Sequence, residues 1–372
     1  MTTRAIVVCS LEAWDDVWRR NQYLVRELLA ADPELRVLFV EPPVDPLDAA
    51  LRRYPVRRGS GLREIPGYGG RLHALEPTKW LPRALGGWAD RALDRATARA
   101  VRRLGWDSAA VWINDPRRAG LVAMLKSPSI YDVTDDWVLA ERGARESSLL
   151  SRTDAELCAS ATEVVVCSPR LQATKGGTLV PNGVDVDRYR APAPRPADLP
   201  ASPLAVYCGT LHEDRLDVSL VADLGAAMAR QDGGLVLVGP NALPPDVAER
   251  VRRCPGVTVL GHRHRDLVPG YLQHADVLVV PHRVVPFTET LDPIKFYEYL
   301  AVGRPIVSTP VAGFRDSPAV TVVEPSEFAG AAAAVAAAGA ATVRHEQVPD
   351  WSSRAADFGA VLDRATSRGD TS

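Results

Sequence analysis

The sequence predicts an α/β protein with two consecutive domains, each a parallel β-sheet covered by helices on both faces. Three observations lead to this prediction. The chain has 372 residues, more than a single hydrophobic core usually serves. Short apolar runs alternate with longer amphipathic segments in both halves, which is the pattern of βαβ units. A proline-rich stretch separates the two halves.

In the first half, the apolar runs have the length and composition of buried strands. Residues 17–31 follow the first run and carry apolar side chains at helical spacing. The expected strands are 4–10, 35–43, 109–115, 128–135, 163–168 and 177–182.

The segment 189–203, "YRAPAPRPADLPASP", contains five prolines and has no hydrophobic period. Proline fixes φ and lacks a backbone donor, so this segment does not suit the centre of a sheet. We therefore expect an N-terminal domain at 1–190, a linker at 191–203, a C-terminal domain at 204–350, and a final helix and tail at 351–372.

The second half repeats the strand and helix pattern, and a cleft between the two domains is the expected place for a ligand. Residues 330–341 are rich in alanine and predict an ordinary surface helix. The expected strands are 204–210, 234–240, 257–262, 275–282, 304–310 and 319–325.

The composition excludes several classes of protein. The formal net charge of −2 offers no overall attraction to nucleic acid. The five cysteines lie far apart, which favours reduced thiols in a cytoplasmic protein over disulfides or a zinc site. The first residues lack the long apolar core of a signal peptide, and we expect no membrane-spanning segment.

The stretch "DPIKFYEYLAVGRPIVSTPVAGF" at 292–314 predicts a helix followed by a buried strand. Asp292 is expected as the N-cap and Pro293 as the first helical residue, and Gly303 suits a left-handed C-terminal cap. The preceding loop, 281–290, leaves the end of a strand, where helix N-termini commonly bind anions.

Lys295 and Glu298 lie near the start of this helix. With the helix N-terminus, Lys295 suits a diphosphate, and the two oxygens of Glu298 suit the paired hydroxyls of a ribose. The alternative is a solvated i, i+3 ion pair without function. Spacing alone leaves both interpretations open.

Three segments resemble the bacterial GT-B glycosyltransferases, especially the subgroup of xanthan-type and teichuronic-acid-type glucuronosyltransferases. The segment "FTETLDPIKFYEYLAVGRPIVSTPVAGFR" resembles their donor-binding signature. The segment "TLVPNGVDVDRY" at 178–189 resembles the stretch before their interdomain linker, and "YDVTDDW" at 131–137 resembles an acidic motif of their N-terminal domain.

The resemblance implies that the C-terminal domain binds a nucleotide sugar and that the N-terminal domain holds the acceptor. Glu298 then binds the donor ribose and Lys295 the diphosphate, with Ile294 beside it. Gly209 and Thr210 match the glycine turn near the phosphates. UDP is the favoured carrier, with dTDP and GDP left open.

Two further residues are assigned to the donor site. Arg215 is a candidate second cation for the phosphates, with a surface arginine as the alternative. His262 matches the loop that meets the nucleotide base through backbone atoms. His262, His264 and His274 fit no common zinc spacing, and relatives need no metal, so we expect neither metal nor cofactor.

The resemblance breaks at one position that bears on the mechanism. Retaining relatives carry a glutamate eight residues before the ribose-binding one, where this chain has Thr290, with Glu289 shifted by one. This departure puts a retaining mechanism in doubt and leaves the Thr290 hydroxyl as a possible donor to phosphate.

An inverting transfer needs a general base, for which Asp135 and Asp136 are the candidates and Asp132 is a third choice. Capping of the following helix is the alternative role for Asp135 or Asp136.

The loop after the first strand, "SLEAWDDVW", has no glycine, which disfavours a dehydrogenase. Its Trp14, Asp15 and Asp16 are candidates for acceptor contact, and aromatic packing explains Trp14 equally well.

Residues 51–103 contain thirteen Arg plus Lys against four Asp plus Glu. This surplus permits peripheral contact with an anionic membrane, although a solvated basic face is the commoner explanation. The sequence leaves two rival functions open: a nucleotide-sugar epimerase and a non-catalytic nucleotide-sugar-binding protein. It does not determine the oligomeric state.

Overall fold

The computed structural model describes residues 4–51, 53–81, 87–106, 109–136, 144–339 and 342–369. The chain divides into two compact units. Unit 1 holds the described residues from 4 to 181 together with 352–369, and unit 2 holds residues 182–351.

Unit 1 is built on an eight-stranded sheet in the order β3-β4-β2-β1-β5-β6-β7-β8. All neighbouring strands are parallel except β3 and β4, which form an antiparallel pair. The strands are β1 (Ala5–Cys9), β2 (Arg36–Val40), β3 (Gly61–Glu64), β4 (Leu72–Glu76), β5 (Ala110–Ile113), β6 (Ser129–Val133), β7 (Glu163–Val166) and β8 (Thr178–Leu179).

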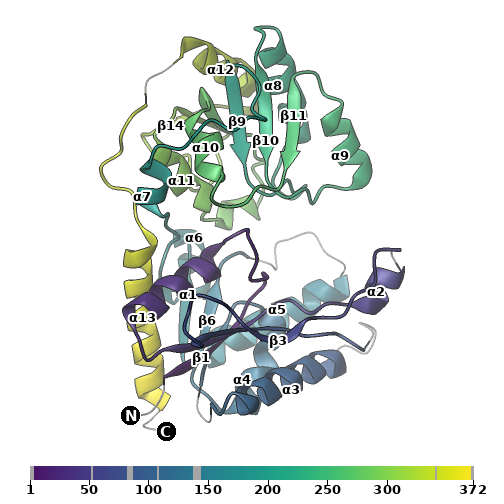
Figure 1. The fold of residues 1–372 in the computed structure, drawn as a ribbon, viewed down its shortest axis with the longest axis vertical. Helices are drawn as coiled ribbons and strands as arrows, with labels where there is room; N and C mark the ends of the chain where they lie inside the picture. The colour runs from purple at the N-terminus through teal and green to yellow at the C-terminus, as the bar shows by residue number, and fades with distance from the viewer. Residues whose placement is uncertain are drawn as a thin grey trace. The chain divides into compact units, whose positions relative to one another are not determined.

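Helices pack around this sheet, as Figure 1 shows. The last helix of the chain returns to unit 1, where the rings of Trp112 and Phe358 lie 4.3 Å apart. The helices of unit 1 are α1 (Arg20–Ala31), α2 (Pro46–Leu51), α3 (Gly87–Arg103), the 3-10 turn η2 (Pro116–Arg118), α4 (Ala119–Leu125), α5 (Ala144–Ser160), α6 (Pro169–Lys175) and α13 (Trp351–Gly369), whose first residue belongs to unit 2.

Unit 2 has a six-stranded, fully parallel sheet in the order β11-β10-β9-β12-β13-β14. The strands are β9 (Leu204–Cys208), β10 (Gly234–Val238), β11 (Val257–Gly261), β12 (Val277–Val280), β13 (Ile306–Ser308) and β14 (Val320–Val322). The helices are α7 (Val186–Arg190), α8 (Val218–Ala229), α9 (Pro245–Arg252), α10 (Val268–Gln273), the 3-10 turn η3 (Thr288–Thr290), α11 (Ile294–Val302) and α12 (Pro325–Ala338).

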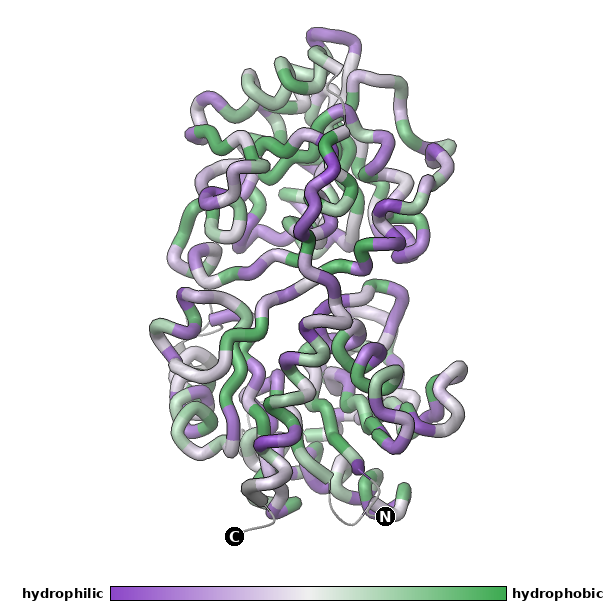
Figure 2. Tube along the Cα trace, turned by 90° about the vertical axis from the view of Figure 1, so that its left-hand side faces the viewer, coloured by the Kyte–Doolittle hydropathy of each residue, from purple (hydrophilic) through white to green (hydrophobic). Residues whose placement is uncertain are grey.

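The core of unit 2 lies on both faces of its sheet, because β9, β10 and β12 are buried along their whole length. One buried cluster includes Val206 and Tyr299 and the other includes Ala205 and Phe328, so successive strand residues face opposite sides. In Figure 2, green hydrophobic stretches of the trace alternate with purple hydrophilic ones within the unit.

The predicted fold class is confirmed, and a strand lies within or at each of the twelve predicted positions. Sequence reasoning missed the β3–β4 hairpin, since both strands are short and β3 is only partly buried. The observed division also differs from the predicted boundaries. Residues 182–190 belong to unit 2, where α7 packs against α11, and α13 packs on unit 1.

Candidate functional site

In unit 2, the carboxyl ends of β9 and β12 lie side by side at the centre of the sheet. The chain runs from β9 outward to β10 and β11 and then returns to β12 on the other side of β9. Such a reversal of strand order is where open α/β sheets bind ligands. Gly209 follows β9 there, and His282 follows β12.

Gly209 has a φ of +147°, a backbone conformation that favours glycine. A Cβ atom at this position would lie 2.7 Å from Lys295 Nζ and 3.0 Å from its Cε. Lys295 can therefore occupy this position only because Gly209 has no side chain. This confirms a glycine turn directly after the first strand of the unit.

Lys295 extends from the first turn of α11 to two polar side chains of the sheet edge. Its Nζ donates to the hydroxyl of Tyr207 at 2.7 Å and lies 3.4 Å from Nε2 of His282. The Tyr207 hydroxyl lies 3.1 Å from the same Nε2. A neutral His282 that accepts at Nε2 fits both contacts.

Arg215 adds a second positive charge close to this group. It lies in the loop between β9 and α8, and its guanidinium carbon is 5.7 Å from the centre of the Phe287 ring. Its buried Nε atom has no hydrogen-bond partner among the described residues. An unsatisfied buried donor is costly, so a ligand that accepts from it would stabilise this arrangement.

The charges of Lys295 and Arg215 beside a neutral His282 are those of an anion-binding site. Burial, and secondarily the charge of Arg215, lower the pKa of Lys295 to about 7. Burial and the two cations also hold the pKa of His282 well below its usual range. Within the described part of the chain, neither Lys295 nor Arg215 forms a salt bridge with a carboxylate. Two half-buried cations that no carboxylate of the described residues pairs with suit a polyanion.

Glu298 lies one turn along α11 from Lys295, so the two side chains share one side of the helix. The Tyr189 hydroxyl donates to Oε1 of Glu298. Among the described residues, no hydrogen bond reaches its Oε2. Burial raises the pKa of this carboxyl. The interpretation of Lys295 and Glu298 as a solvated ion pair is therefore wrong, because the lysine contacts Tyr207 and the glutamate contacts Tyr189.

The start of α11 differs from the prediction by one residue. The helix begins at Ile294, with Pro293 in the N-cap position and no side-chain cap. Asp292 is not the N-cap, because its carboxylate accepts from the Asn182 backbone at 2.5 Å and from the Tyr297 hydroxyl at 2.7 Å. Gly303 is the left-handed C-cap, as predicted.

Thr290 is buried, and its hydroxyl donates to the Phe287 carbonyl at 2.8 Å. A hydroxyl has one proton, and here that proton is directed at a backbone carbonyl, so donation from Thr290 to phosphate stays a prediction. Its neighbour Glu289 forms a salt bridge with Arg315. The side chains of Thr290 and Glu289 are thus both held by contacts within unit 2.

The other two predicted donor-binding residues sit at strand ends of the same edge. Thr210 follows Gly209, and its carbonyl accepts weakly from the Tyr207 hydroxyl at 3.4 Å. The His262 side chain is exposed after β11, and its carbonyl accepts from Arg263 at 2.9 Å. A carbonyl has a second lone pair, so backbone contact from His262 to a base stays a prediction.

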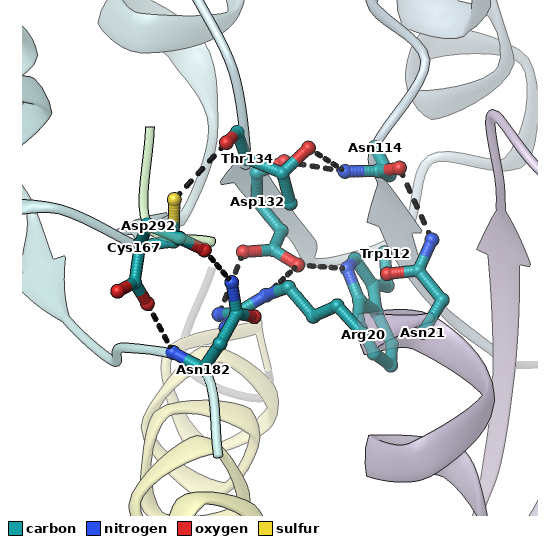
Figure 3. A network of polar contacts seen from close by, with 9 residues as sticks. All are labelled: Arg20, Asn21, Trp112, Asn114, Asp132, Thr134, Cys167, Asn182 and Asp292. Atoms are coloured by element: carbon teal, nitrogen blue, oxygen red, sulfur yellow. Dashed lines mark hydrogen bonds and ion pairs between the residues drawn. The ribbon is translucent and has the colours of Figure 1, made fainter. Parts of the chain in front are cut away.

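In unit 1, Asp132 is a buried structural residue rather than a general base. Two hydrogen bonds of 3.1 Å join its carboxylate to the Arg20 guanidinium, and the Trp112 indole donates to it at 3.2 Å, as Figure 3 shows. A buried carboxylate that already accepts hydrogen bonds from an arginine and an indole is not available to take a proton from a substrate. The third choice for the base is therefore wrong.

The chain that leaves β6 is held in place by side chains of neighbouring strands. Asn114 donates to the Asp132 carbonyl at 3.0 Å and to the Thr134 hydroxyl at 3.2 Å. The Cys167 thiol donates to the Thr134 carbonyl at 3.0 Å, also shown in Figure 3. These contacts fix the residue directly before Asp135.

Asp136 lies 3.4 Å from Lys175, whose ammonium group also contacts Asp154 at 2.7 Å. This lysine neutralises two carboxylates and anchors the loop after β6. The Asp136 carboxylate is thus engaged by Lys175, and its role as a base stays a prediction. The cap interpretation concerns residues 137–143, which lie outside the described residues.

Asp135 lies close to a carboxyl group that sequence reasoning did not single out, Glu12. Burial raises the pKa of Glu12 to about 7, Arg19 opposes this rise, and the charges of Asp135 and Asp15 add to it. Arg19 Nε lies 3.5 Å from Glu12, and the Glu12 backbone donates to Ser10. The loops after β1 and β6 thus bring three carboxyl groups together.

Trp14 is packed among aromatic rings, with centroids 5.1 Å from Phe39, 5.6 Å from Trp18 and 6.0 Å from Tyr68. Its backbone donates to Glu41 at 2.7 Å. Asp15 is exposed and accepts from the Val17 backbone at 2.9 Å. The packing interpretation of Trp14 is supported, and contact of either residue with an acceptor stays a prediction.

The residues that sequence reasoning missed are Tyr207, His282, Tyr189 and Glu12. Tyr207 and His282 lie in or directly after predicted strands, where a polar side chain at the carboxyl end was the available signal. No local signal marked Tyr189 or Glu12. Among the described residues, no group of three or more His, Cys, Asp or Glu side chains is placed to hold a metal ion.

Comparison with known proteins agrees with this geometry. Residues 202–338 match the family model described as "Glycosyl transferases group 1". The chain is 26% identical over 200 residues to "Putative teichuronic acid biosynthesis glycosyltransferase TuaH" of Bacillus subtilis (strain 168). The match covers 48% of this chain and half the length of that relative.

Solved glycosyltransferase structures share the fold over nearly the whole chain. Sucrose-phosphate synthase from Thermosynechococcus elongatus matches with a TM-score of 0.68 at 21% identity, covering 98% of this chain and 100% of that one. The trehalose-6-phosphate protein from E. coli bound with UDP-2-fluoro glucose matches with a TM-score of 0.61 at 12% identity, covering 99% and 97%. These matches confirm the predicted GT-B fold. The family model and the Bacillus subtilis relative confirm the resemblance to glycosyltransferases.

Proposed function

We propose that this chain is a glycosyltransferase that moves a sugar from a nucleotide-diphosphate donor to a hydroxyl group of an acceptor. The observation that carries the proposal is the pair of half-buried cations, Lys295 and Arg215, at the central sheet edge of unit 2. The family match over residues 202–338 supports the same reaction class.

In this proposal, the diphosphate binds next to Gly209 and the N-terminus of α11, in contact with Lys295 and Arg215. Both cations and the free N–H groups of the helix end neutralise negative charge that grows on the leaving diphosphate. Glu298 accepts from the ribose hydroxyls through Oε2 while Tyr189 orients it through Oε1. The side chains of this site supply charge stabilisation without a metal ion.

The acceptor hydroxyl must lose a proton, which we assign to the carboxyl groups of Glu12 and Asp135. A base is most effective when its pKa lies near the working pH, and that of Glu12 is raised to about 7. Asp135 is the alternative base, and its negative charge contributes to the raised pKa of Glu12. Trp14 and Asp15 lie in the same loop after β1 and are proposed to contact the acceptor.

UDP is the proposed carrier, and the neighbour whose structure contains UDP-2-fluoro glucose supports this choice. The acceptor is proposed to be a small molecule, a glycan or a lipid-linked sugar on the cytoplasmic side of the cell. No described helix has the length and hydropathy needed to cross a bilayer. Peripheral contact with an anionic membrane is part of the proposal and rests on the basic segment 51–103.

A thermal-shift panel tests the donor first. A ligand that binds the folded state raises the melting temperature, so UDP should raise it more than dTDP, GDP or inorganic phosphate. No shift with any nucleoside diphosphate would rule out the donor site.

The reaction is tested by incubating the pure protein with UDP-sugars, alone and with candidate acceptors, and separating the products. A transferase needs an acceptor for product to form at a useful rate. Conversion of the donor into an isomer without acceptor would indicate an epimerase, and binding without turnover under any condition would indicate a sugar-nucleotide-binding protein.

A further inference from the structure

Unit 1 exposes an unusual number of large apolar side chains in one part of the chain. Six of the ten such side chains among the described residues fall between positions 47 and 88. Trp80 is 59% exposed and Trp88 is 62% exposed. They share this part of the chain with Leu47, Leu51, Tyr54 and Val56.

Helix α3 contributes a stripe of arginines to the same part of unit 1. Arg91, Arg95, Arg99 and Arg102 are exposed and follow Trp88 at steps of three or four residues. These five side chains fall within an arc of about 80° around the helix. Asp90 and Asp94 lie outside this arc, and Asp94 forms a salt bridge with the buried Arg118.

The arginines of this stripe are not neutralised by acidic side chains among the described residues. Across the described ranges, none of its four arginines forms a salt bridge. Two arginines instead lie on the tryptophans, with Arg58 5.0 Å from the ring centre of Trp80 and Arg91 4.6 Å from that of Trp88. Each tryptophan ring is thus in cation–π contact with an arginine, and this contact does not neutralise the charge of the arginine.

A cavity of about 420 Å³ lies between the segment that carries Trp80 and helix α3, which carries Trp88. Its walls come from the end of β4 with the residues after it and from α3. Leu75, Pro77, Ala89 and Leu93 give it an apolar interior, while Trp80, Arg95 and Arg99 also line it. Glu76 lines it too, in a salt bridge of 2.7 Å with Arg57. Apolar volume beside cationic groups suits an amphipathic anion.

We propose that Arg58, Trp80, Trp88, Arg91, Arg95 and Arg99 form a docking face for an anionic lipid bilayer. Tryptophan rings prefer the boundary between headgroups and acyl chains, and arginines bind the lipid phosphates. The cavity then receives apolar parts of a lipid. This face gives the proposed membrane contact its residues, and it does not depend on the donor site of unit 2.

Two other occupants fit the face less well. A second copy of the chain would bring the same arginine stripe against itself in a symmetric dimer, which like charges oppose. Single-stranded nucleic acid needs open aromatic faces for its bases, but Arg58 and Arg91 cover one face of each tryptophan. Exposed aliphatic side chains such as Leu51, 85% exposed, favour an apolar medium over bases.

Vesicle co-sedimentation of the full chain tests the proposal, with phosphatidylcholine vesicles with and without phosphatidylglycerol. Binding is expected only to the anionic vesicles and should weaken with added salt. The variant R91Q/R95Q/R99Q should lower the partition coefficient on the order of 100-fold, at about fivefold for each arginine. The variant W80S/W88S should lower it at least about tenfold, since burial of apolar surface is lost.

The matched control is R170Q/R230Q/R344Q, which removes the same charge from exposed positions elsewhere. Its vesicle binding should stay within about twofold of the wild type. Equal weakening in this control, or equal binding to neutral and anionic vesicles, would overturn the proposal. So would absence of vesicle binding, or W80S/W88S variants that change only self-association or RNA binding.

The same variants keep the two proposals separate. The residues substituted in R91Q/R95Q/R99Q and W80S/W88S are exposed and lie in unit 1, so melting temperature and the UDP-induced shift should match the wild type. Failure of vesicle binding with an intact UDP shift removes the docking face and leaves the donor site standing. Loss of the UDP shift in the wild type removes the donor site alone.

Discussion

The ammonium group of Lys295 lies 2.7 Å from the hydroxyl oxygen of Tyr207 and 3.9 Å from the centre of the same ring. The lysine is held by a neutral side chain, although a carboxylate would neutralise it better. Glu298 on the same helix is instead held by Tyr189. This separation keeps one positive and one negative group available to different parts of a ligand.

Lys295→Met should weaken UDP binding roughly 10- to 100-fold, the usual worth of a hydrogen bond to a charged group. It should also raise the melting temperature of the ligand-free protein, because an enclosed cation is removed. Isothermal calorimetry and thermal melting measure the two effects. Arg230→Met, at an exposed position of unit 2, is the control and should change neither. Unchanged UDP affinity in Lys295→Met would contradict the site.

UDP affinity should fall as the pH rises above about 7. The pKa of Lys295 is lowered to about 7 in the free protein, and a bound diphosphate raises it again, so binding takes up a proton above that pH. The affinity should drop by up to about tenfold per pH unit and level off below about pH 6.5. Calorimetry between pH 6 and 9 measures this, and Lys295→Met should show a flat profile over pH 7–9.

The ligand-free protein should respond to pH in the opposite direction. The unfolded chain binds more protons than the folded one between pH 7 and the ordinary lysine pKa of 10.5. The contribution of Lys295 to the free energy of unfolding therefore rises with pH across that window.

Glu298→Gln should weaken UDP binding roughly 10- to 100-fold and leave inorganic pyrophosphate binding nearly unchanged. The reason is that a charged acceptor for ribose hydroxyls is lost, while the phosphate contacts remain. The amide oxygen can still accept from Tyr189, so the fold is expected to persist. Competition calorimetry with the two ligands measures the difference. An equal loss for both ligands would show that Glu298 does not contact the ribose.

Gly209→Ala should abolish UDP binding and destabilise unit 2 by a few kcal/mol. The substitution combines a strained φ of +147° with a Cβ atom 2.7 Å from Lys295 Nζ. Gly330→Ala is the matched control, because no atom lies within 4 Å of its Cβ position in α12. This control should stabilise the protein by up to about 1 kcal/mol. Thermal melting of both variants measures the change in stability, and calorimetry measures the change in UDP binding.

Glu12→Gln and Asp135→Asn distinguish the two candidate bases. If Glu12 is the base, Glu12→Gln should slow transfer by about 10²- to 10⁴-fold with unchanged UDP affinity. Asp135→Asn should then move the acidic limb of the pH–rate profile to lower pH, since the charge of Asp135 raises the pKa of Glu12. If Asp135 is the base, its own variant loses transfer instead. Normal turnover in both variants would exclude this cluster.

Much of the fold was accessible from the sequence. Uninterrupted apolar runs such as 204–208 and 277–280 mark strands buried on both faces. The proline-rich segment 189–203, expected to hold the boundary, lies inside unit 2, which begins at Asn182. The β3–β4 hairpin was missed because Gly61–Glu64 is neither apolar nor regularly alternating. The place of this hairpin in the sheet follows from the pairing of β4 with β2 more than thirty residues earlier, which no local pattern encodes.

The sequence by itself determined the residue types of the donor site, namely a lysine and a glutamate three positions apart on one helix and a glycine after a strand. Only the tertiary structure decided their partners. Tyr207, His282 and Arg215 reach Lys295 from other strand ends, and Glu12 reaches Asp135 from another loop. The physical reason is that parallel strands gather residues far apart in the chain at one edge. Burial there sets the pKa values, and burial is a property of the packed chain.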